Sequence, residues 1–347
     1  MTNVTLSGLP DPALVARFAE GLERLWPAED RVDAHGRTGA LGLAVSGGPD
    51  SLAMLALAAT ALPGEIAVAS VNHGLRPEAA DEIAYVERVC AALEVPFTAL
   101  DVTVAGGNLQ ARARAARYAA LSRWVREQRL GALATAHHDD DQAETLLMRL
   151  ARGSGLSGLA GVRAASPFDP EDGGDPFPLL RPLLGWRKAE LEEIVASCGL
   201  VPVRDPSNEE VRFDRVRVRD HLAQHDWLDP AAFSTSAAHL AEAWRAIEWY
   251  AQIDWEEMVE READSPAFRY AANVPRIIQI ETVVRIVREL GGVVSRSEAG
   301  RAADRLWRGD NASLGGVLAV PTVERIAKVG VEMRVWRFSP EPPRRMH

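Results

Sequence analysis

The segment LGLAVSGGPDS at residues 41–51 decides the fold. A short apolar run, which predicts a strand over 41–45, leads directly into a glycine loop and then into a helix predicted over 51–62. The loop consists of Ser46, Gly47, Gly48, Pro49, Asp50 and Ser51. At the carboxyl end of a parallel strand, the N–H groups of such a loop and of the following helix form an anion cradle. The loop therefore predicts a site for a chain of phosphates, with an ordinary glycine turn capped by Ser51 as the alternative.

From Leu41 onward, short apolar runs alternate with longer segments of helical period. Further strands are predicted over 66–71, 97–102 and 130–135, and further helices over 78–93, 108–127, 142–152 and 187–198. This alternation is typical of an α/β domain, in which helices cover both faces of a parallel sheet. Residues 165–178 are dense in Pro, Gly and Asp, so we expect an exposed loop there.

The pattern of predicted helices and strands changes beyond residue 220. Ala- and Glu-rich helices are expected through about residue 262, and again over 283–290 and 298–307. Residues 314–320 and 333–338 alternate in the manner of short antiparallel strands. We therefore expect two domains, an α/β domain over 1–225 and a smaller, mostly helical α+β domain over 226–347.

Composition restricts the class of protein. With 347 residues and 47% apolar content, the chain can bury a substantial core. No leader peptide or apolar run long enough to span a bilayer is recognisable, so the expected location is the cytoplasm. The net charge of −10 argues weakly against a nucleic-acid partner, although a local basic patch can still form. Cys90 and Cys198 are far apart and are expected to be buried thiols.

Three consecutive carboxylates, Asp139, Asp140 and Asp141, follow the strand predicted over 130–135. Like charges repel when they are desolvated, so a positive partner is expected beside them. Mg²⁺ is the obvious candidate, because it takes oxygen ligands and bridges carboxylates to phosphates. The alternative is an acidic first helical turn, which the helix dipole favours.

The glycine loop resembles a known signature. SGGPDS is similar to the SGGxDS motif of the N-type ATP pyrophosphatases, the PP-loop family, and it is neither a Walker A loop nor a GxGxxG fingerprint. The resemblance implies that Ser46–Ser51 hold the β,γ-pyrophosphate of ATP, which the family cleaves between the α and β phosphates. It also implies that Asn72 and His73 lie beside the adenine, although a lone His73 would more often be a loop histidine.

A second motif narrows the resemblance. TAHHDDDQAET over 135–145 is similar to the AHHxDDQxET block of the tRNA(Ile)-lysidine synthases and their tRNA-thiolating relatives. Asp139 falls on the variable position of this block. We therefore expect functional roles for Asp140 and Asp141 before Asp139. ARAARY at 113–118 and RGSGLSGL at 152–159 match further elements of the same enzymes.

Two later elements favour the lysidine-forming branch. RPLL at 181–184 and DPSN at 205–208, followed by Arg215 and Arg219, are similar to its RPLL and DxSN…RNxxR patterns. The sequence departs from the second pattern at Val216, where the family usually has Asn. Thiolating relatives carry cysteines for sulfur or an iron–sulfur cluster, and this sequence has no CxxC pair.

The resemblance implies a two-step ligase reaction. ATP, with Mg²⁺, would adenylate the C2 carbonyl oxygen of the wobble cytidine in an isoleucine tRNA with a CAU anticodon, and free L-lysine would displace AMP. Asp50 and Asp141 would hold Mg²⁺, Arg114 would neutralise negative charge, and His137 or Asp140 would act as general base. The C-terminal domain would select the tRNA. The alternatives are another AMP-forming PP-loop enzyme, either a tRNA thiolase or a small-molecule amide ligase, and a non-catalytic nucleotide- or tRNA-binding protein.

Overall fold

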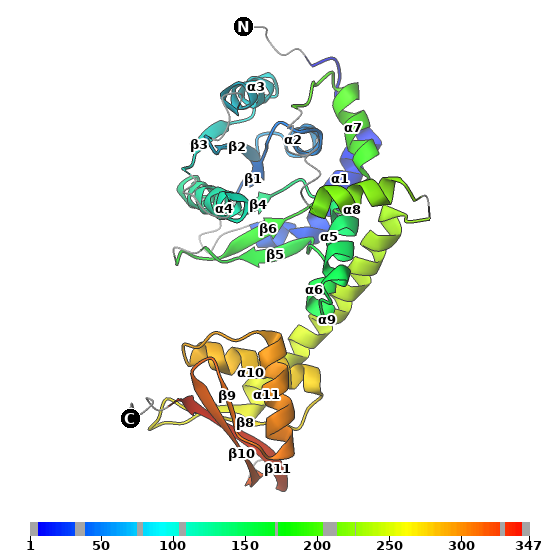
Figure 1. Ribbon diagram of the computed structural model, residues 1–347. Coiled ribbons are helices and arrows are strands. Elements are labelled where there is room, and N and C mark those ends of the chain that lie inside the picture. Colours follow the sequence, from blue (N-terminus) through cyan, green and yellow to red (C-terminus); the bar gives the residue numbers. More distant parts are fainter. Residues whose placement is uncertain are drawn as a thin grey trace. The chain divides into compact units, whose positions relative to one another are not determined.

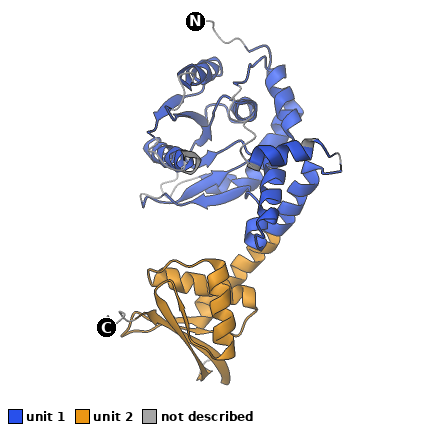
Figure 2. Ribbon diagram, in the orientation of Figure 1, with its two compact units in different colours: residues 1–241 blue, residues 242–347 orange. Residues whose placement is uncertain are grey.

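The computed structural model describes residues 6–31, 39–74, 79–103, 109–170, 173–203, 214–225, 227–326 and 330–341. The chain forms two compact units, residues 1–241 and 242–347, and the division falls within helix α9 (Pro230–Met258) (Figure 2). No helix in these ranges is both long enough and apolar enough to cross a membrane.

The first unit is built on a six-stranded sheet with the order β3-β2-β1-β4-β6-β5 (Figure 1). Its strands are β1 (Leu41–Ala44), β2 (Ile66–Asn72), β3 (Phe97–Asp101), β4 (Ala132–Ala134), β5 (Ala165–Phe168) and β6 (Phe177–Leu180). All neighbours pair in parallel except β5, which runs antiparallel to β6 at the edge. The predicted α/β fold with a parallel sheet is confirmed.

Helices cover both faces of this sheet, as predicted. They are α1 (Pro12–Leu25), α2 (Pro49–Ala61), α3 (Ala79–Ala92), α4 (Leu109–Glu127), α5 (Asp139–Ala151), α6 (Leu156–Leu159), α7 (Lys188–Ser197) and α8 (Asp214–Ala223), with a short 3-10 turn at Ala28–Arg31. Leu41 and Leu43 of β1 are buried among α1, α2 and α7. Gly42, between them, faces Trp124 of α4, and a Cβ at Gly42 would lie 2.8 Å from that indole. The alternation of strand side chains thus creates two cores.

The prediction of an exposed loop over 165–178 is wrong. Residues 165–168 and 177–180 form the antiparallel strands β5 and β6, so only the intervening part is a connection. Phe168 and Phe177 pack with ring centroids 5.2 Å apart, and Phe168 stacks on Tyr118 of α4 at 5.3 Å. These aromatic contacts outweigh the turn-rich composition, even though Pro167 and Pro178 lie within the two paired strands.

The strand order places the motifs together. From the centre of the sheet, β1, β2 and β3 follow one another toward one edge, and β4 and β6 follow one another toward the opposite edge. The point at which the strand order reverses therefore lies between β1 and β4. Ligands of open α/β sheets bind beyond the carboxyl ends of the strands at such a point. The glycine loop follows β1, and the acidic segment, Asp139–Asp141, follows β4, so both motifs lie at this position.

The second unit contains a five-stranded antiparallel sheet, with the order β7-β8-β11-β10-β9 (Figure 1). The strands are β7 (Val259–Arg261), β8 (Phe268–Ala271), β9 (Ala312–Leu314), β10 (Val317–Ile326) and β11 (Val331–Pro340). Helices α10 (Arg276–Glu289) and α11 (Arg296–Arg308) pack with it around a core that includes Tyr270 and Trp336. The α+β character is confirmed, and the two predicted strands belong to a larger sheet than the alternation indicated.

The division at residue 241 lies later than the boundary expected near 225. The first turns of α9 pack on the first unit, where Ser234 Oγ donates to the carbonyl of Leu184 at 3.3 Å. Ala237 is fully buried, and a Cβ built on Gly161 would lie 3.2 Å from its methyl group. A helix that starts on one unit and continues into the next carries no break in composition that a sequence-based boundary could follow.

Candidate active site

The glycine loop is closed by one serine side chain. Ser51 Oγ accepts from the backbone N–H of Ser46 at 3.2 Å and donates to the carbonyl of Gly48 at 3.0 Å. Helix α2 begins at Pro49, and its N-cap residue Gly48 supplies no side-chain hydrogen bond to the helix N-terminus. The first N–H groups of a helix have no partner inside the helix, so they remain able to bind an anion.

Helix α2 holds this loop rigidly. Its residues from Ser51 to Ala58 are all buried, so the helix is apolar on every side and lies inside the core. On the other side of the loop, the N–H of Val203 donates to the carbonyl of Gly47 at 2.9 Å. Gly47 has a φ of +86°, a conformation that favours glycine, and a Cβ there would lie 3.1 Å from Val203.

A cavity of about 1080 Å³ opens beside the loop and brings most of the predicted site residues together. Its lining includes Ser46, Gly48, Pro49, Asp50, Ser51, His73, Arg114, His137 and Asp141. Three predicted residues are not among those that line it, namely Gly47, Asn72 and Asp140. Gly47 acts through its backbone conformation. The amide of Asn72 is used locally, because it donates to Asp101 Oδ1 at 2.8 Å and accepts from the N–H of Gly74 at 3.0 Å.

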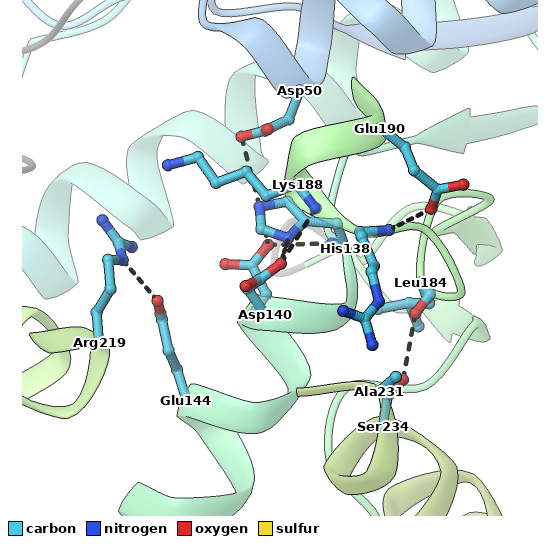
Figure 3. A network of polar contacts seen from close by, with 12 residues as sticks. Asp50, His138, Asp140, Glu144, Leu184, Lys188, Glu190, Arg219, Ala231 and Ser234 are labelled. Carbon is cyan, nitrogen blue, oxygen red and sulfur yellow. Dashed lines mark hydrogen bonds and ion pairs between the residues drawn. The ribbon is translucent and has the colours of Figure 1, made fainter. Parts of the chain in front are cut away.

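A buried histidine connects the two motifs (Figure 3). His138 lies between β4 and α5, and its Nδ1 is 3.3 Å from Asp140 Oδ2. Its Nε2 lies 3.6 Å from Asp50 Oδ2 and 3.7 Å from Asp141 Oδ2. The backbone N–H of His138 also donates to Asp141 Oδ2 at 3.1 Å. One imidazole is therefore surrounded by three carboxylates, two from the acidic segment and one from the glycine loop.

This arrangement decides the charge of His138. Burial alone lowers the pKa of the ring, but the hydrogen bonds and charges of Asp140, Asp50 and Asp141 raise it to about 10. Burial likewise opposes ionisation of Asp141, and the charges of His138 and Arg215 outweigh it and lower the pKa of that carboxyl. No role was assigned to His138 from the sequence. The signal that could have revealed it is the histidine doublet that immediately precedes three carboxylates.

His137 has the opposite character. Burial favours the neutral ring and lowers the pKa of His137 to about 4. The positive charges of Arg181 and Arg215 act in the same direction, whereas the negative charge of Asp141 opposes the shift. Its Nδ1 lies 3.0 Å from Thr135 Oγ1. At neutral pH His137 is thus an uncharged ring in the wall of the cavity, whereas its neighbour His138 is an imidazolium.

Helix α5, which begins with the acidic segment, also holds helix α8 through ion pairs. Glu144 is buried, with its side chain 1% exposed, and its Oε1 accepts from Arg219 Nε at 2.7 Å. Arg215 pairs with both Glu144 and Asp141. The two arginines are partly buried, with side chains 43% and 42% exposed. The RxxxR spacing therefore places both guanidinium groups of α8 on the acidic face of α5.

A second cavity of about 900 Å³ lies on the α8 side of the acidic segment. It is lined by Pro49, Asp50, His138, Asp140, Asp141, Glu144, Arg187, Lys188, Arg215, Arg219, Leu222, His225, Leu228, Asp229 and Pro230. Asp140 faces this cavity, and its Oδ2 accepts from the backbone N–H of Lys188 at 3.1 Å. Asp139 lines neither cavity, in keeping with its variable place in the motif.

The two arginines of the 113–118 element, Arg114 and Arg117, both line the first cavity. The guanidinium carbon of Arg114 lies 5.0 Å from the ring centroid of Tyr118, and that of Arg117 lies 5.2 Å from it. Arg114 is exposed. Burial lowers the pKa of Arg117, and the charge of Arg114 lowers it further, whereas Tyr118 acts in the opposite direction. His73, which also lines this cavity, has a pKa lowered by burial and by Arg117, so its ring is neutral.

Other motif residues have local contacts. The glycine-rich segment 152–161 is tied to α5, because Gln142 Nε2 donates to the carbonyl of Val162 at 2.6 Å and Arg149 Nη1 donates to that of Gly161 at 3.0 Å. Arg181 is buried, and its Nη1 donates to the carbonyl of Arg163 at 2.6 Å. The DPSN element, 205–208, lies outside the described residues. Val216 is half-buried on α8.

The fold and this site define a PP-loop domain, a class of ATP-using domain. Residues 27–226 match the family described as the PP-loop domain. The chain is 43% identical over 94% of its length to a tRNA(Ile)-lysidine synthase of Novosphingobium aromaticivorans, covering 98% of that protein. It is 39% identical over 89% of its length to one of Zymomonas mobilis, covering 90% of that protein. The chain belongs to the tRNA(Ile)-lysidine synthase family.

A solved structure supports the fold independently. A U34-tRNA thiolase of Methanococcus maripaludis, solved with its [4Fe-4S] cluster, superposes with a TM-score of 0.51 at 16% identity. The match covers 66% of this chain and 80% of the thiolase. At this identity the likeness concerns the fold alone.

Proposed function

We propose that this protein ligates free L-lysine to C2 of the wobble cytidine in an isoleucine tRNA with a CAU anticodon. ATP is the energy source, lysidine, AMP and pyrophosphate are the products, and the modified anticodon reads AUA. The observation that carries this proposal is that one cavity is lined by both the SGGPDS loop and the acidic segment after β4. Membership of the tRNA(Ile)-lysidine synthase family supports the choice of substrate. We place the reaction in the cytoplasm, the location expected from the sequence.

In the first step, the C2 carbonyl oxygen of cytidine attacks the α-phosphorus of ATP. The new O–P bond replaces the bond to the β-phosphate, and pyrophosphate leaves with the electron pair. The loop from Ser46 to Ser51, with the uncapped N-terminus of α2, binds and orients the pyrophosphate. Arg114 offsets the negative charge that develops. His73, as a neutral ring in the same cavity, lies beside the adenine, and Asn72 shapes the turn that carries it.

Asp50 and Asp141 are the proposed ligands of Mg²⁺. Both carboxylates approach the same atom of His138, and Asp50 Oδ1 is buried without a hydrogen-bond partner in the described part of the chain. No group of three or more His, Cys, Asp or Glu side chains suited to a metal occurs among the described residues. Two carboxylates plus substrate phosphates and water suit Mg²⁺ bound with a nucleotide. The cation would neutralise the phosphate oxygens during transfer.

In the second step, an amine of lysine attacks C2 and forms an N–C2 bond. The C2–O bond breaks, and AMP leaves with that oxygen and the electron pair. The second cavity suits lysine because Asp140, which lines it, complements an ammonium group while Arg187 complements the carboxylate. The attacking amine must lose a proton, for which His137, neutral at pH 7, and Asp140 are the proposed acceptors.

Selection of the tRNA is assigned to the C-terminal domain, residues 226–347. One cytidine is chemically like another, so recognition requires contacts away from the reacting base. Arg301, Arg305 and Arg308 are all exposed on α11, at spacings of three and four residues. Such a row of guanidinium groups suits contact with backbone phosphates.

A thiolase reaction is the less favoured alternative. Cys90 and Cys198 are both buried, and neither lines either cavity. Pyrophosphate release distinguishes the candidates. Release that requires both unmodified isoleucine tRNA and lysine supports the proposed function. Release with a small amide-forming substrate, or with a sulfur donor in place of lysine, points to another PP-loop enzyme, and no release under any condition points to a binding protein.

A further inference from the structure

Lys188 lies at the junction of the two cavities. It is the first residue of α7, and it lines both the cavity beside the glycine loop and the acid-lined cavity. The residues that line both cavities are Pro49, Asp50, Asp141, Lys188 and Arg215. This short set marks the boundary across which any reaction between ligands of the two cavities must occur.

The main chain of Lys188 is fixed while its amine is not. The backbone N–H donates to Asp140 Oδ2, and the preceding turn is held by the N–H of Asp139, which donates to the carbonyl of Trp186 at 3.0 Å. Within the described chain, the charged contact recorded for Nζ is with Glu192 Oε1 at 3.9 Å, too long for a good hydrogen bond. In Figure 3 the side chain extends away from Asp140, toward the side of the site on which Asp50 lies.

Arg215, the other cation at the junction, is already committed. It pairs with Asp141 and with the buried Glu144, so its charge is balanced by two carboxylates. The Lys188 side chain is 40% exposed, and its amine carries only the weak pair with Glu192. Among the described residues that line both cavities, Lys188 is therefore the cation that remains available to a ligand.

We propose that the Lys188 amine contacts the α-phosphate of ATP and, after transfer, the phosphate of the adenylated cytidine. This inference rests on the proposed function, in which the α-phosphorus is the atom exchanged between the ATP side and the lysine side. In the first step, the amine offsets charge on the α-phosphate oxygens as the bond to pyrophosphate breaks. In the second, it offsets the charge on AMP as the C2–O bond breaks and AMP departs with the electron pair.

The position also separates Lys188 from the pyrophosphate-binding residues. Ser46, Gly48 and Ser51 line the first cavity only, so they contribute nothing to the side from which lysine approaches. A residue that lines both cavities serves both chemical steps. A compact ammonium, unlike a planar guanidinium, can follow one phosphate group through this transfer.

Binding measurements without tRNA test the contact directly. AMP and inorganic pyrophosphate are titrated separately, with Mg²⁺, against the full-length protein and its Lys188→Met, Lys188→Arg and Arg123→Met variants. Arg123 is an exposed cation of α4 that lines neither cavity, so its loss controls for net charge. Lys188→Met should weaken AMP binding about tenfold and leave pyrophosphate binding unchanged. Lys188→Arg should bind AMP nearly as well as the wild type.

Single-turnover kinetics test the role in both steps. Lys188→Met should slow both pyrophosphate release and conversion of adenylated tRNA to lysidine by roughly 10- to 100-fold, with the KM for lysine unchanged. Wild-type AMP affinity in Lys188→Met would overturn the inference, as would a defect confined to the KM for lysine, which would assign Lys188 to the lysine carboxylate. If AMP binding weakens as expected but wild-type turnover does not depend on tRNA and lysine, the contact stands and the proposed function fails.

Discussion

His138 Nε2 lies 3.6 Å from Asp50 Oδ2, so the imidazole that follows β4 meets the carboxylate of the glycine loop. The contact between these two residues could not be assigned from the sequence, because the two positions are far apart along the chain. The same nitrogen lies 3.7 Å from Asp141 Oδ2. The imidazolium thereby holds together the two carboxylates proposed to bind Mg²⁺, and it compensates their charge in the free protein.

The metal assignment predicts the effect of replacing Asp141. Asp141→Asn is nearly isosteric, and the new amide oxygen can still accept from the N–H of His138, so the fold should be retained. Turnover should fall by roughly 100-fold or more, since one charge is lost where phosphate is transferred. Titration of Mg²⁺ against single-turnover AMP formation measures this. Asp139→Asn is the matched control because Asp139 lines neither cavity, and wild-type rates in Asp141→Asn would remove Asp141 from the metal site.

Glu144 is predicted to anchor α8 locally. Glu144→Gln removes the buried carboxylate that pairs with Arg215 and Arg219. We expect a loss of about 1–3 kcal/mol, less than for a fully buried pair because both arginines are partly exposed. Amide hydrogen exchange should therefore rise in α8, while β1 and α2 keep their protection. Glu193→Gln, an exposed change on α7, is the control, and equal protection of α8 in both variants would show that Glu144 is not the anchor.

The second unit contains a group whose titration affects stability. Asp254 is 3% exposed, its Oδ2 accepts from Thr282 Oγ1 at 2.9 Å, and burial raises its pKa despite the hydrogen bonds it accepts. The raised pKa means that the stability from the protonated carboxyl is fully present below its ordinary pKa of about 3.9 and is lost as the pH rises through the folded-state pKa.

Asp254→Asn removes this titration and leaves an oxygen to accept from Thr282. The unfolding free energy of the variant relative to the wild type should therefore increase as the pH is raised from about 4 toward 7. Each unit of difference between the folded and unfolded pKa is worth about 1.4 kcal/mol. Thermal unfolding across this pH range measures the difference. A difference that does not change with pH would mean that Asp254 ionises normally in the folded chain.

Much of the first unit could be predicted from the sequence because short apolar runs alternate along it with longer segments of helical period. The strand predicted over 41–45 and the helix over 108–127 both occur, with small shifts at their ends. The hairpin of β5 and β6 was missed because its stability comes from Phe168 and Phe177 packing near Tyr118, a contact between distant positions. Local composition carries no signal for such a contact.

In the site, as in the fold, local motifs could be predicted from the sequence and contacts between distant residues could not. The resemblance implied that Ser46–Ser51, Arg114, His137 and Asp141 share one site, and all of them except Gly47 line one cavity. The roles of His138 and Glu144 depend on which charges the fold brings to them. Glu144 meets Arg215 across a separation of 71 residues, and the burial that makes this pair specific is a property of the folded chain.

The arginine row on α11 predicts how tRNA binds. Replacing Arg301, Arg305 and Arg308 with Gln should weaken tRNA affinity and flatten its salt dependence, by as much as about one unit of slope for each arginine–phosphate pair removed, with ATP binding unchanged. Filter binding over a salt series measures both quantities. A matched triple change of Arg245, Arg288 and Arg325, which are exposed on other elements of the same unit, controls for charge. Equal affinity and slope in the α11 variant and the wild type would remove α11 from the interface.

The most direct test of the proposed ligase is the chemical identity of its product. Unmodified isoleucine tRNA with a CAU anticodon is incubated with the protein, ATP, Mg²⁺ and lysine, and its nucleosides are then analysed by mass spectrometry. We predict that the wobble cytidine gains the mass of one lysine less one water, with one AMP formed for each modified nucleoside. An unmodified wobble cytidine, or a sulfur-containing nucleoside in its place, would contradict the proposed function.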